Sequence, residues 1–165
     1  FRDKKKYIVQ QGIDLAKYKD STFDIRIIYQ KNGEGNWIIS KKFIRVAARG
    51  SSISNISKGG RAEQSKIVMS HVLHKNKSLI IDKNNEMKYL CEAVATTMEK
   101  ASQSILGELG LDIGIDKEGR LWLIEVNSKP RKTTETEMSQ TIVRNTFKRP
   151  LEYAVYLAGF SNSKI

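Results

Sequence analysis

The sequence is poor in cysteine, proline and long apolar runs, and each shortage excludes a class of protein. A single cysteine, Cys91, cannot form an intrachain disulfide, so this is not a small secreted domain held together by disulfides. No apolar run approaches the roughly 20 residues that cross a bilayer, which excludes a helical membrane span. The two prolines, Pro130 and Pro150, both fall late, and no low-complexity tract divides the chain. One continuous folded unit is therefore expected.

The remaining composition predicts a soluble globular domain. The chain has 165 residues, of which 39% are hydrophobic and 28% charged, enough for one core. It does not begin with Met and lacks the apolar stretch of a signal peptide, so we expect a fragment of a longer, cytoplasmic protein. The net charge of +11 would attract polyanions. Acidic residues separate most of the basic groups, however, which is more typical of a solvated surface than of a nucleic-acid groove.

Several short segments have the patterns of strands and turns. Residues 22–30 alternate apolar and polar side chains, which predicts a half-buried strand. Asn32-Gly-Glu-Gly-Asn has turn composition, and Trp37 to Ala48 would form the return strand of a hairpin. Upstream, Tyr7-Ile-Val-Gln-Gln-Gly-Ile predicts a shorter buried strand. Arg49 to Gln64 is rich in Gly, Ser and Asn and predicts a functional or mobile loop.

Two helices are expected. Asn84-Asn85 can cap a helix whose apolar residues recur every three or four positions: Met87, Leu90, Val94, Met98, Ala101 and Ile105. Pro150 in a first helical turn and Gly159 just past a last turn bracket a closing helix, Leu151 to Ala158. Strands interrupted by helices on one side predict the α+β class.

An acidic hairpin from Gly110 to Asn127 is the most informative segment. A two-residue loop at Lys117-Glu118 would set Asp112 opposite Leu123. One face would then be apolar, with Leu111, Ile113, Ile115, Trp122, Ile124 and Val126. The other would carry Asp112, Gly114, Asp116, Leu123, Glu125 and Asn127. A three-residue loop would break this register.

The second face of that hairpin predicts a magnesium site. Asp112 and Glu125 would be diagonal neighbours about 7 Å apart, with Asn127 next on the same face. Oxygen ligands with few protein contacts suit Mg²⁺, which keeps water and substrate phosphates in its other positions. The alternative is that both carboxylates merely face solvent from a half-exposed sheet.

These residues resemble a known signature. Leu111-Asp-Ile-Gly-Ile-Asp followed by Leu123-Ile-Glu-Val-Asn-Ser-Lys-Pro is similar to the metal-binding strands of ATP-grasp enzymes. The resemblance implies that Asp112, Glu125 and Asn127 hold magnesium, with manganese as the alternative, against the phosphates of ATP.

Upstream segments resemble the same superfamily in the same order. The strand at Tyr7 resembles the hinge that meets adenine, which implies contacts from Gln10, Gln11 and Ile13. Phe23-Asp-Ile-Arg resembles the Asp-x-Arg strand, and Ser54-Asn-Ile-Ser-Lys-Gly-Gly resembles a loop that implies a phosphate or acceptor site at Asn55, Gly59 and Gly60. The candidates for neutralising phosphate or holding a substrate carboxylate are Arg26, Arg45, Arg49 and Lys58, of which Arg26 and Arg45 are favoured. The alternative for each is an ordinary ion pair with Asp14, Asp24 or Glu63.

The whole set is most similar to the YheC/YheD group of endospore coat-associated proteins, from Tyr7 to about Gly159. The resemblance implies an antiparallel or mixed sheet with helices packed on one face. It also implies that residues 1–165 are the C-terminal, Mg-ATP-binding region of the ATP-grasp domain. The preceding subdomain, which carries a lysine and a glycine-rich loop, is missing from this sequence.

Three functions remain open at this point. The resemblance favours an ATP-dependent ligase that joins an unidentified carboxylate to an amine through an acyl phosphate, with an association with the spore coat. The second is a catalytically silent module that binds spore-coat proteins. The third, a basic nucleic-acid binder, lacks the strand of interleaved aromatic and basic residues that a stacking platform needs.

Overall fold

The computed structural model describes residues 9–48, 59–132 and 139–160. The strands are β1 (Lys17–Tyr18), β2 (Ser21–Lys31), β3 (Trp37–Val46), β4 (Arg61–Glu63), β5 (Glu108–Ile115) and β6 (Leu121–Asn127). The helices are α1 (Ser65–Val72), α2 (Lys77–Ser102) and α3 (Gln140–Leu157). Arg49, Asn55 and Lys58 lie outside the described residues.

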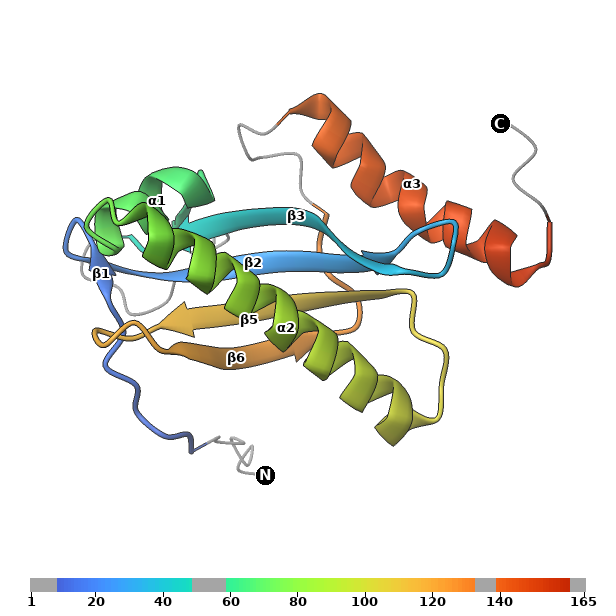
Figure 1. Cartoon of the computed structure of the whole chain (residues 1–165), viewed down its shortest axis with the longest axis horizontal. Helices are drawn as coiled ribbons and strands as arrows, with labels where there is room; N and C mark the ends of the chain where they lie inside the picture. The colour runs from blue at the N-terminus through green and yellow to red at the C-terminus, as the bar shows by residue number, and fades with distance from the viewer. Residues whose placement is uncertain (1–8, 49–58, 133–138, 161–165) are drawn as a thin grey trace, which may run out of the picture.

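One sheet organises the described part of the chain. Its strand order is β4-β3-β2-β5-β6, with β1 paired to the start of β2, and every strand pair is antiparallel. α2 runs obliquely across the face of this sheet that is nearer the viewer in Figure 1. The predicted α+β class with an antiparallel sheet is confirmed.

The core lies between the sheet and the helices α1 and α2. The alternation predicted for β2 is confirmed, because Phe23, Ile25, Ile27 and Tyr29 all belong to the main buried cluster. β5 contributes Leu109, Leu111, Ile113 and Ile115, and the helices contribute Val68, Met69, Met87, Cys91 and Ala95. Cys91 is fully buried and behaves as a small apolar residue, as expected. The opposite face of the sheet carries the polar residues of β2.

α2 begins eight residues earlier than its sequence pattern indicates. The prediction that Asn84-Asn85 caps it is wrong, because the Asn76 side chain accepts the Leu79 N–H at 3.1 Å. Asn84 instead lies inside the helix, where its side-chain oxygen accepts a hydrogen bond from Lys42 Nζ at 2.5 Å. Met87 of the predicted apolar stripe is buried, whereas Met98 is 37% and Ile105 70% exposed.

α3 also begins earlier than expected and contains Pro150 in its interior. Proline has no N–H, so the carbonyl of Thr146 loses its usual helical donor. Gln30 on β2 replaces that donor, with its Nε2 2.8 Å from the Thr146 oxygen. Since Gln30 belongs to the sheet face opposite the main core, α3 contacts the side of the sheet that α1 and α2 leave uncovered.

If Pro150 is replaced, the hydrogen bond from Gln30 to the Thr146 carbonyl should contribute less to stability. Pro150→Ala is expected to raise the free energy of unfolding, by at most about 3 kcal/mol, because alanine restores the N–H. Gln30→Leu should cost about 1–3 kcal/mol in the native background, since it leaves a buried carbonyl without a donor, and less in the Pro150→Ala background. Urea unfolding of the four proteins measures both values. An equal cost in the two backgrounds would contradict this account of α3.

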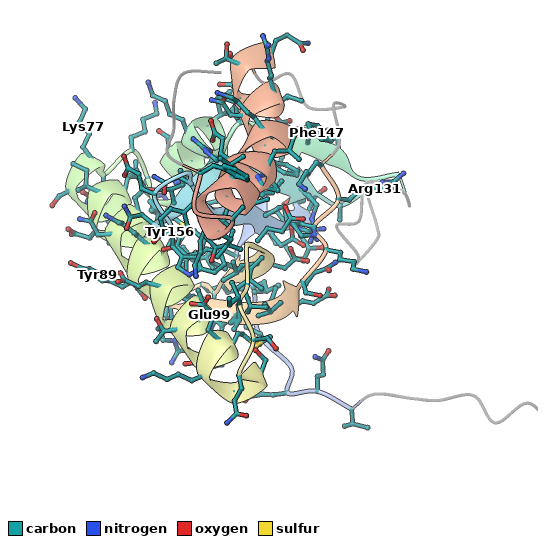
Figure 2. The ribbon with its side chains drawn as sticks, turned by 90° about the vertical axis from the view of Figure 1, so that its right-hand side faces the viewer. Lys77, Tyr89, Glu99, Arg131, Phe147 and Tyr156 are labelled. Carbon is teal, nitrogen blue, oxygen red and sulfur yellow. The ribbon has the colours of Figure 1, made fainter. Side chains whose placement is uncertain are left out.

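A junction between α2, the β2–β3 hairpin and α3 is centred on Lys31. Its Nζ lies 2.6 Å from Glu99 of α2 and 3.3 Å from the Tyr153 hydroxyl of α3. Figure 2 shows Glu99 on the inner side of α2, facing the sheet, while Tyr89 points away from it. The hairpin turn itself is as predicted, with the Asn32 side chain accepting the N–H groups of Glu34 and Asn36. These contacts hold both helices against one end of the sheet.

Two segments differ from their predicted structure. Residues 9–13 form no strand, and Val9 is 97% exposed, so the predicted buried strand is wrong for that stretch; Tyr7 and Ile8 lie outside the described residues. Within the predicted loop 49–64, residues 61–63 form β4. Among the described residues, no helix has the length and apolar character of a membrane span.

Candidate functional site

The turn of the β5–β6 hairpin fixes the geometry of the candidate site. Asp116 and Arg120 close the turn through the Asp116 N–H and Arg120 carbonyl at 3.0 Å, leaving Lys117, Glu118 and Gly119 as a three-residue loop. Gly119 has a φ of +80°, a conformation that glycine adopts without strain. The predicted two-residue loop is therefore wrong. Asp112 lies directly opposite Glu125, rather than opposite Leu123.

A register irregularity beside Asp112 changes the two faces of this hairpin. Leu111 pairs with Val126, but Ile113 pairs with Leu123, so Ile124 is the extra residue of β6. The Ile124 side chain lies over Gly114, on the face of Asp112. Trp122 is also on this face, because its Nε1 donates to Asp116. The prediction that Trp122 and Ile124 point into the core with Leu111 is wrong.

Asp116 holds the turn together through three hydrogen bonds. Its carboxylate accepts the Arg120 N–H at 2.8 Å, Arg120 Nε at 2.7 Å and Trp122 Nε1 at 2.8 Å. Burial alone would raise the pKa of Asp116, but the bonds from Trp122 and Arg120 outweigh burial and lower the pKa to about 2. The folded state is thus stabilised by the charged form of Asp116.

Stability should depend on pH through this carboxylate. Because its pKa is lower in the folded state, the contribution of Asp116 is complete above its ordinary pKa of 3.8 and is lost as the pH falls toward about 2. Asp116→Asn should therefore be less stable than the native protein at pH 7, with the difference shrinking between pH 4 and pH 2. Urea unfolding across this range tests the expectation, with Asp82→Asn on the exposed side of α2 as the control. A difference that does not change with pH would contradict it.

Four side chains form a row across the sheet, one from each of four neighbouring strands. Phe43 of β3 pairs with Arg26 of β2, Arg26 pairs with Asp112 of β5, and Asp112 pairs with Glu125 of β6. In the next row, Ala62 of β4 pairs with Arg45, and Arg45 pairs with Asp24. The antiparallel register thus brings together residues far apart in sequence, including four of the predicted site residues: Arg26, Arg45, Asp112 and Glu125.

The two arginines of these rows are bound to the two aspartates. Arg26 donates through Nε and Nη2 to Asp112, the latter at 2.8 Å. Arg45 donates to both Asp24 oxygens at 2.7 and 2.6 Å and to Asp112 Oδ2 at 2.7 Å. Burial alone would lower the pKa of Arg45, but the hydrogen bonds and charge of Asp24, with those of Asp112, raise its pKa. Arg45 therefore stays charged within the sheet.

Glu125 differs from the other members of the row. It is exposed, and it has no hydrogen-bond or ion-pair partner among the described residues. Two carboxylates directly opposite each other on a sheet, with Cβ atoms about 5 Å apart, repel unless a cation lies between them. Asn127 follows on the same face, pairs with Gly110, and accepts the Lys129 N–H at 2.8 Å. Its side-chain oxygen keeps one further lone pair.

An apolar surface lies beside this row, toward the hairpin turn. A Cβ at Gly114 would be 2.7 Å from Leu15 Cδ2 and 3.1 Å from Ile124 Cδ1, so these two side chains cover the glycine. The segment of Leu15 runs along the end of β5, where the Ala16 N–H donates to the Ile115 carbonyl at 2.9 Å. The sequence pattern predicts Ile124 in the core and gives no signal for Leu15. A three-residue turn loop, in place of the predicted two-residue loop, places Ile124 on the face of Asp112.

No described contact connects the remaining predicted site residues to this row of side chains. Gln10 and Gln11 are exposed and irregular, and Ile13 is half-buried near the turn end of the hairpin. Gly59 and Gly60 precede β4, and among the described residues a Cβ at Gly59 would contact Ala48 at 3.8 Å. Their predicted roles, with those of Asn55 and Lys58, remain predictions.

The donor atoms of the row fit a hard divalent cation. Asp112, Glu125 and Asn127 offer two carboxylates and an amide oxygen on one exposed sheet face, the ligand set that Mg²⁺ and Mn²⁺ prefer. No group of three His, Cys, Asp or Glu residues within the described ranges could hold a metal. A cation here would therefore complete its coordination with water or substrate oxygens.

The sequence of this chain matches a known family. Residues 1–157 match the family described as YheC/D like ATP-grasp, and the chain belongs to that ATP-grasp family. The resemblance seen in the sequence is thus confirmed.

Two curated proteins of Bacillus subtilis (strain 168) are similar to the chain. It is 24% identical over 153 residues to endospore coat-associated protein YheD, which covers 92% of this chain and 33% of that protein. It is also 24% identical over 158 residues to endospore coat-associated protein YheC, covering 96% of this chain and 42% of that protein. The chain therefore spans less than half the length of either relative.

Proposed function

We propose that this chain supplies the metal-binding half of an ATP-grasp active site, in which a magnesium nucleotide activates a carboxylate for attack by an amine. The observation that carries the proposal is the direct pairing of Asp112 with Glu125, which has no partner among the described residues, beside Arg26 and Arg45. A purely structural ion-pair network would not need an exposed second carboxylate at this position.

The net charge of the site is negative, so we expect a cation to bind before phosphate does. Arg26 and Arg45 carry two positive charges against the three negative charges of Asp24, Asp112 and Glu125. Asp112, Glu125 and Asn127 would hold the metal, which supplies charge neutralisation to the transferred phosphoryl group. The two guanidinium groups lie within the same rows, where they can bind phosphate or carboxylate oxygens as these replace the contacts of Asp112.

The apolar surface formed by Leu15 and Ile124 suits the nucleotide base. It is continuous with the Asp112–Glu125 pair along the hairpin, so a nucleotide could place its base there and its phosphates at the carboxylates. Burial of an aromatic base against aliphatic side chains contributes hydrophobic free energy without needing a specific hydrogen bond.

The proposed reaction has two steps. A substrate carboxylate oxygen attacks the γ-phosphorus of ATP, and ADP leaves. An amine nitrogen then attacks the acyl carbon, phosphate leaves with the C–O bond electrons, and the nitrogen loses a proton. The chain needs no covalent nucleophile for this sequence, because catalysis consists of positioning and charge stabilisation. The names of the relatives add a proposed association with the endospore coat.

Trapping the acyl phosphate tests this function without knowledge of the natural amine. The full-length protein is incubated with Mg-ATP, hydroxylamine and single members of a panel of small carboxylic acids. We expect ADP release that requires an acid and is matched mole for mole by hydroxamate. Nucleotide binding without hydroxamate from any acid would favour a silent coat-binding module. Binding that is restricted to nucleic acid and falls steeply with salt would instead favour the polyanion-binding alternative.

A further inference from the structure

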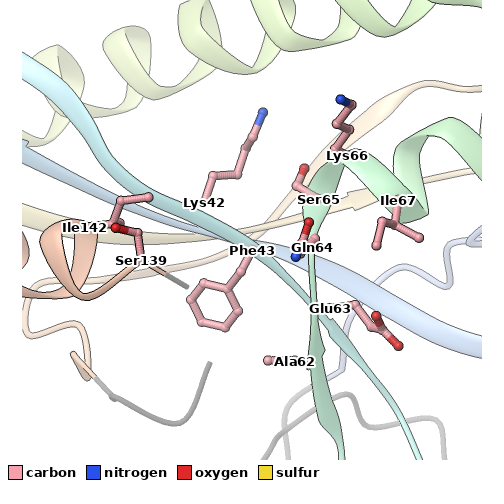
Figure 3. Close-up of a pocket in the computed structure, with 10 residues that line it drawn as sticks. All are labelled: Lys42, Phe43, Ala62, Glu63, Gln64, Ser65, Lys66, Ile67, Ser139 and Ile142. Carbon is pink, nitrogen blue, oxygen red and sulfur yellow. The ribbon is translucent and has the colours of Figure 1, made fainter. Parts of the chain in front are cut away.

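The helix α3 has apolar side chains on two sides. Three buried residues mark the inner side, which packs on the sheet: Val143, Thr146 and Tyr153. Figure 3 shows Ile142 of the first turn beside Phe43 of β3, at a cavity of about 350 Å³ between the helix and the sheet. On the outer side, however, Phe147 is 51% and Leu151 69% exposed. A helix that is apolar all round is usually buried, so we expect a further surface to cover the outer side of α3.

The exposed apolar residues of α3 form one line, called here the outer stripe. Its members are Phe147, Leu151, Ala154 and Ala158, and all four are exposed. They recur at intervals of four, three and four residues, which places them one above another along the helix. Apolar side chains that are exposed singly are ordinary on a protein surface, whereas a continuous stripe indicates a binding surface.

Basic side chains border the outer stripe. Arg144 and Lys148 are exposed, and each stands three residues before a large member of the stripe, so both lie beside it. Arg144 forms no ion pair with a described residue, while Lys148 pairs with Glu152 at 2.9 Å. Lys132, from the segment before the helix, has its Nζ 6.0 Å from the centre of the Phe147 ring. An occupant of the stripe therefore meets positive charge at its margin.

The wider surroundings of the stripe are also positive. Residues 129–160 include six basic and three acidic residues. Figure 2 shows Arg131 and Phe147 on the same side of the molecule, away from α2. The whole chain has a net charge of +11, so its long-range field attracts an extended anionic surface. A second copy of this chain would bring like charges together, which disfavours it as the occupant.

We propose that the outer stripe of α3 binds the surface of a bilayer that contains anionic lipid. Phe147 and Leu151 enter the boundary between headgroups and acyl chains, while Arg144 and Lys148 reach the headgroup phosphates with their long side chains. In Figure 1, α3 lies at the periphery of the described part of the chain, with the sheet on one side of it. The proposal is independent of the ligase activity, because it uses no residue of the row that contains Asp112.

Flotation of the full-length protein with lipid vesicles tests the dependence on charge. Vesicles of phosphatidylcholine alone are compared with vesicles in which about a third of the lipid is phosphatidylglycerol. The protein should bind the anionic vesicles at least about tenfold more tightly, and added salt should weaken that binding. Equal binding to the two kinds of vesicle would overturn the proposal. Binding to neither would also overturn it and would favour an acidic protein as the partner of α3.

Two pairs of variants at exposed positions locate the binding on α3. Arg144→Glu and Lys88→Glu change the net charge equally, but Lys88 lies on the exposed side of α2. Arg144→Glu should weaken binding to anionic vesicles at least about fivefold, and Lys88→Glu at most about twofold. Leu151→Gln should weaken it about tenfold, whereas Tyr89→Gln, at a side chain of α2 that is 71% exposed, should leave it unchanged. Equal effects within either pair would overturn the assignment to α3.

Sedimentation velocity without vesicles tests a second copy as the occupant. The native full-length protein and Leu151→Gln should have the same oligomeric state, because the stripe contacts lipid and not another copy of the chain. A dimer of the native protein that Leu151→Gln abolishes would assign the stripe to a second copy and would overturn the lipid proposal.

Discussion

Glu125→Gln is expected to weaken magnesium-nucleotide binding by at least about tenfold and to leave the free energy of unfolding within about 0.5 kcal/mol of the native value. Glutamine keeps the shape of the side chain but removes the charge that faces Asp112. Stability should hardly change, because Glu125 is exposed and has no partner among the described residues to lose. Calorimetric titration of the full-length protein with Mg-ADP, beside urea unfolding, measures both quantities.

Glu118→Gln is the matched control for that variant. Glu118 lies in the turn of the same hairpin, its side chain is 61% exposed, and it is away from the Asp112 pair. It should bind Mg-ADP as the native protein does. Equal losses in the two variants would indicate a general effect of charge on the hairpin and would contradict the metal assignment.

The largest loss of stability is expected from Arg45→Met. Arg45 is 9% exposed and donates to two aspartates that are 6% and 5% exposed, so its removal leaves two buried carboxylates short of a partner. Breaking a buried pair in this way costs about 3–5 kcal/mol, or a fall in Tm of roughly 10 °C for a chain of this size. Arg45→Lys should recover only part of the loss, because lysine cannot make two parallel bonds to Asp24.

An exposed arginine on the neighbouring strand provides the comparison. Arg61 of β4 pairs with Glu63, but its side chain is 50% exposed. Arg61→Met should therefore change the free energy of unfolding by at most about 1 kcal/mol. Thermal unfolding of the three variants decides the matter. If Arg45→Met and Arg61→Met lose the same small amount, the buried network is not what holds the central strands in register.

The sequence predicts structure best where one repeat of apolar and polar residues runs through a whole segment. β2 alternates from Phe23 to Gln30, and one face of it is buried as the alternation predicts. The acidic hairpin was also recognisable, because Asp112, Glu125 and Asn127 could be assigned to one face by residue type and spacing. The antiparallel pairing of β2 with β5, which brings Arg26 to Asp112, depends on contacts 86 residues apart and has no local signal.

The errors share a physical origin in tertiary contacts that override local preference. The hairpin register depends on a left-handed Gly119 and on the Asp116 carboxylate, which together favour a three-residue loop. The helix start at Asn76 competes with two equally suitable asparagines downstream, and Asn84 instead receives Lys42. Pro150 suggests a first turn, but Gln30 supplies the donor that lets the helix extend through it. A sequence pattern contains none of these partners.

The position of a bound metal ion would test the central claim most directly. Crystals of the full-length protein grown with Mn²⁺ and a non-hydrolysable ATP analogue can be measured at the manganese absorption edge. We expect an anomalous peak about 2.0–2.2 Å from carboxylate oxygens of both Asp112 and Glu125, with analogue phosphate oxygens completing the coordination. Nucleotide bound elsewhere, with no peak beside Glu125 and the Arg26–Asp112 pair undisturbed, would contradict the assignment.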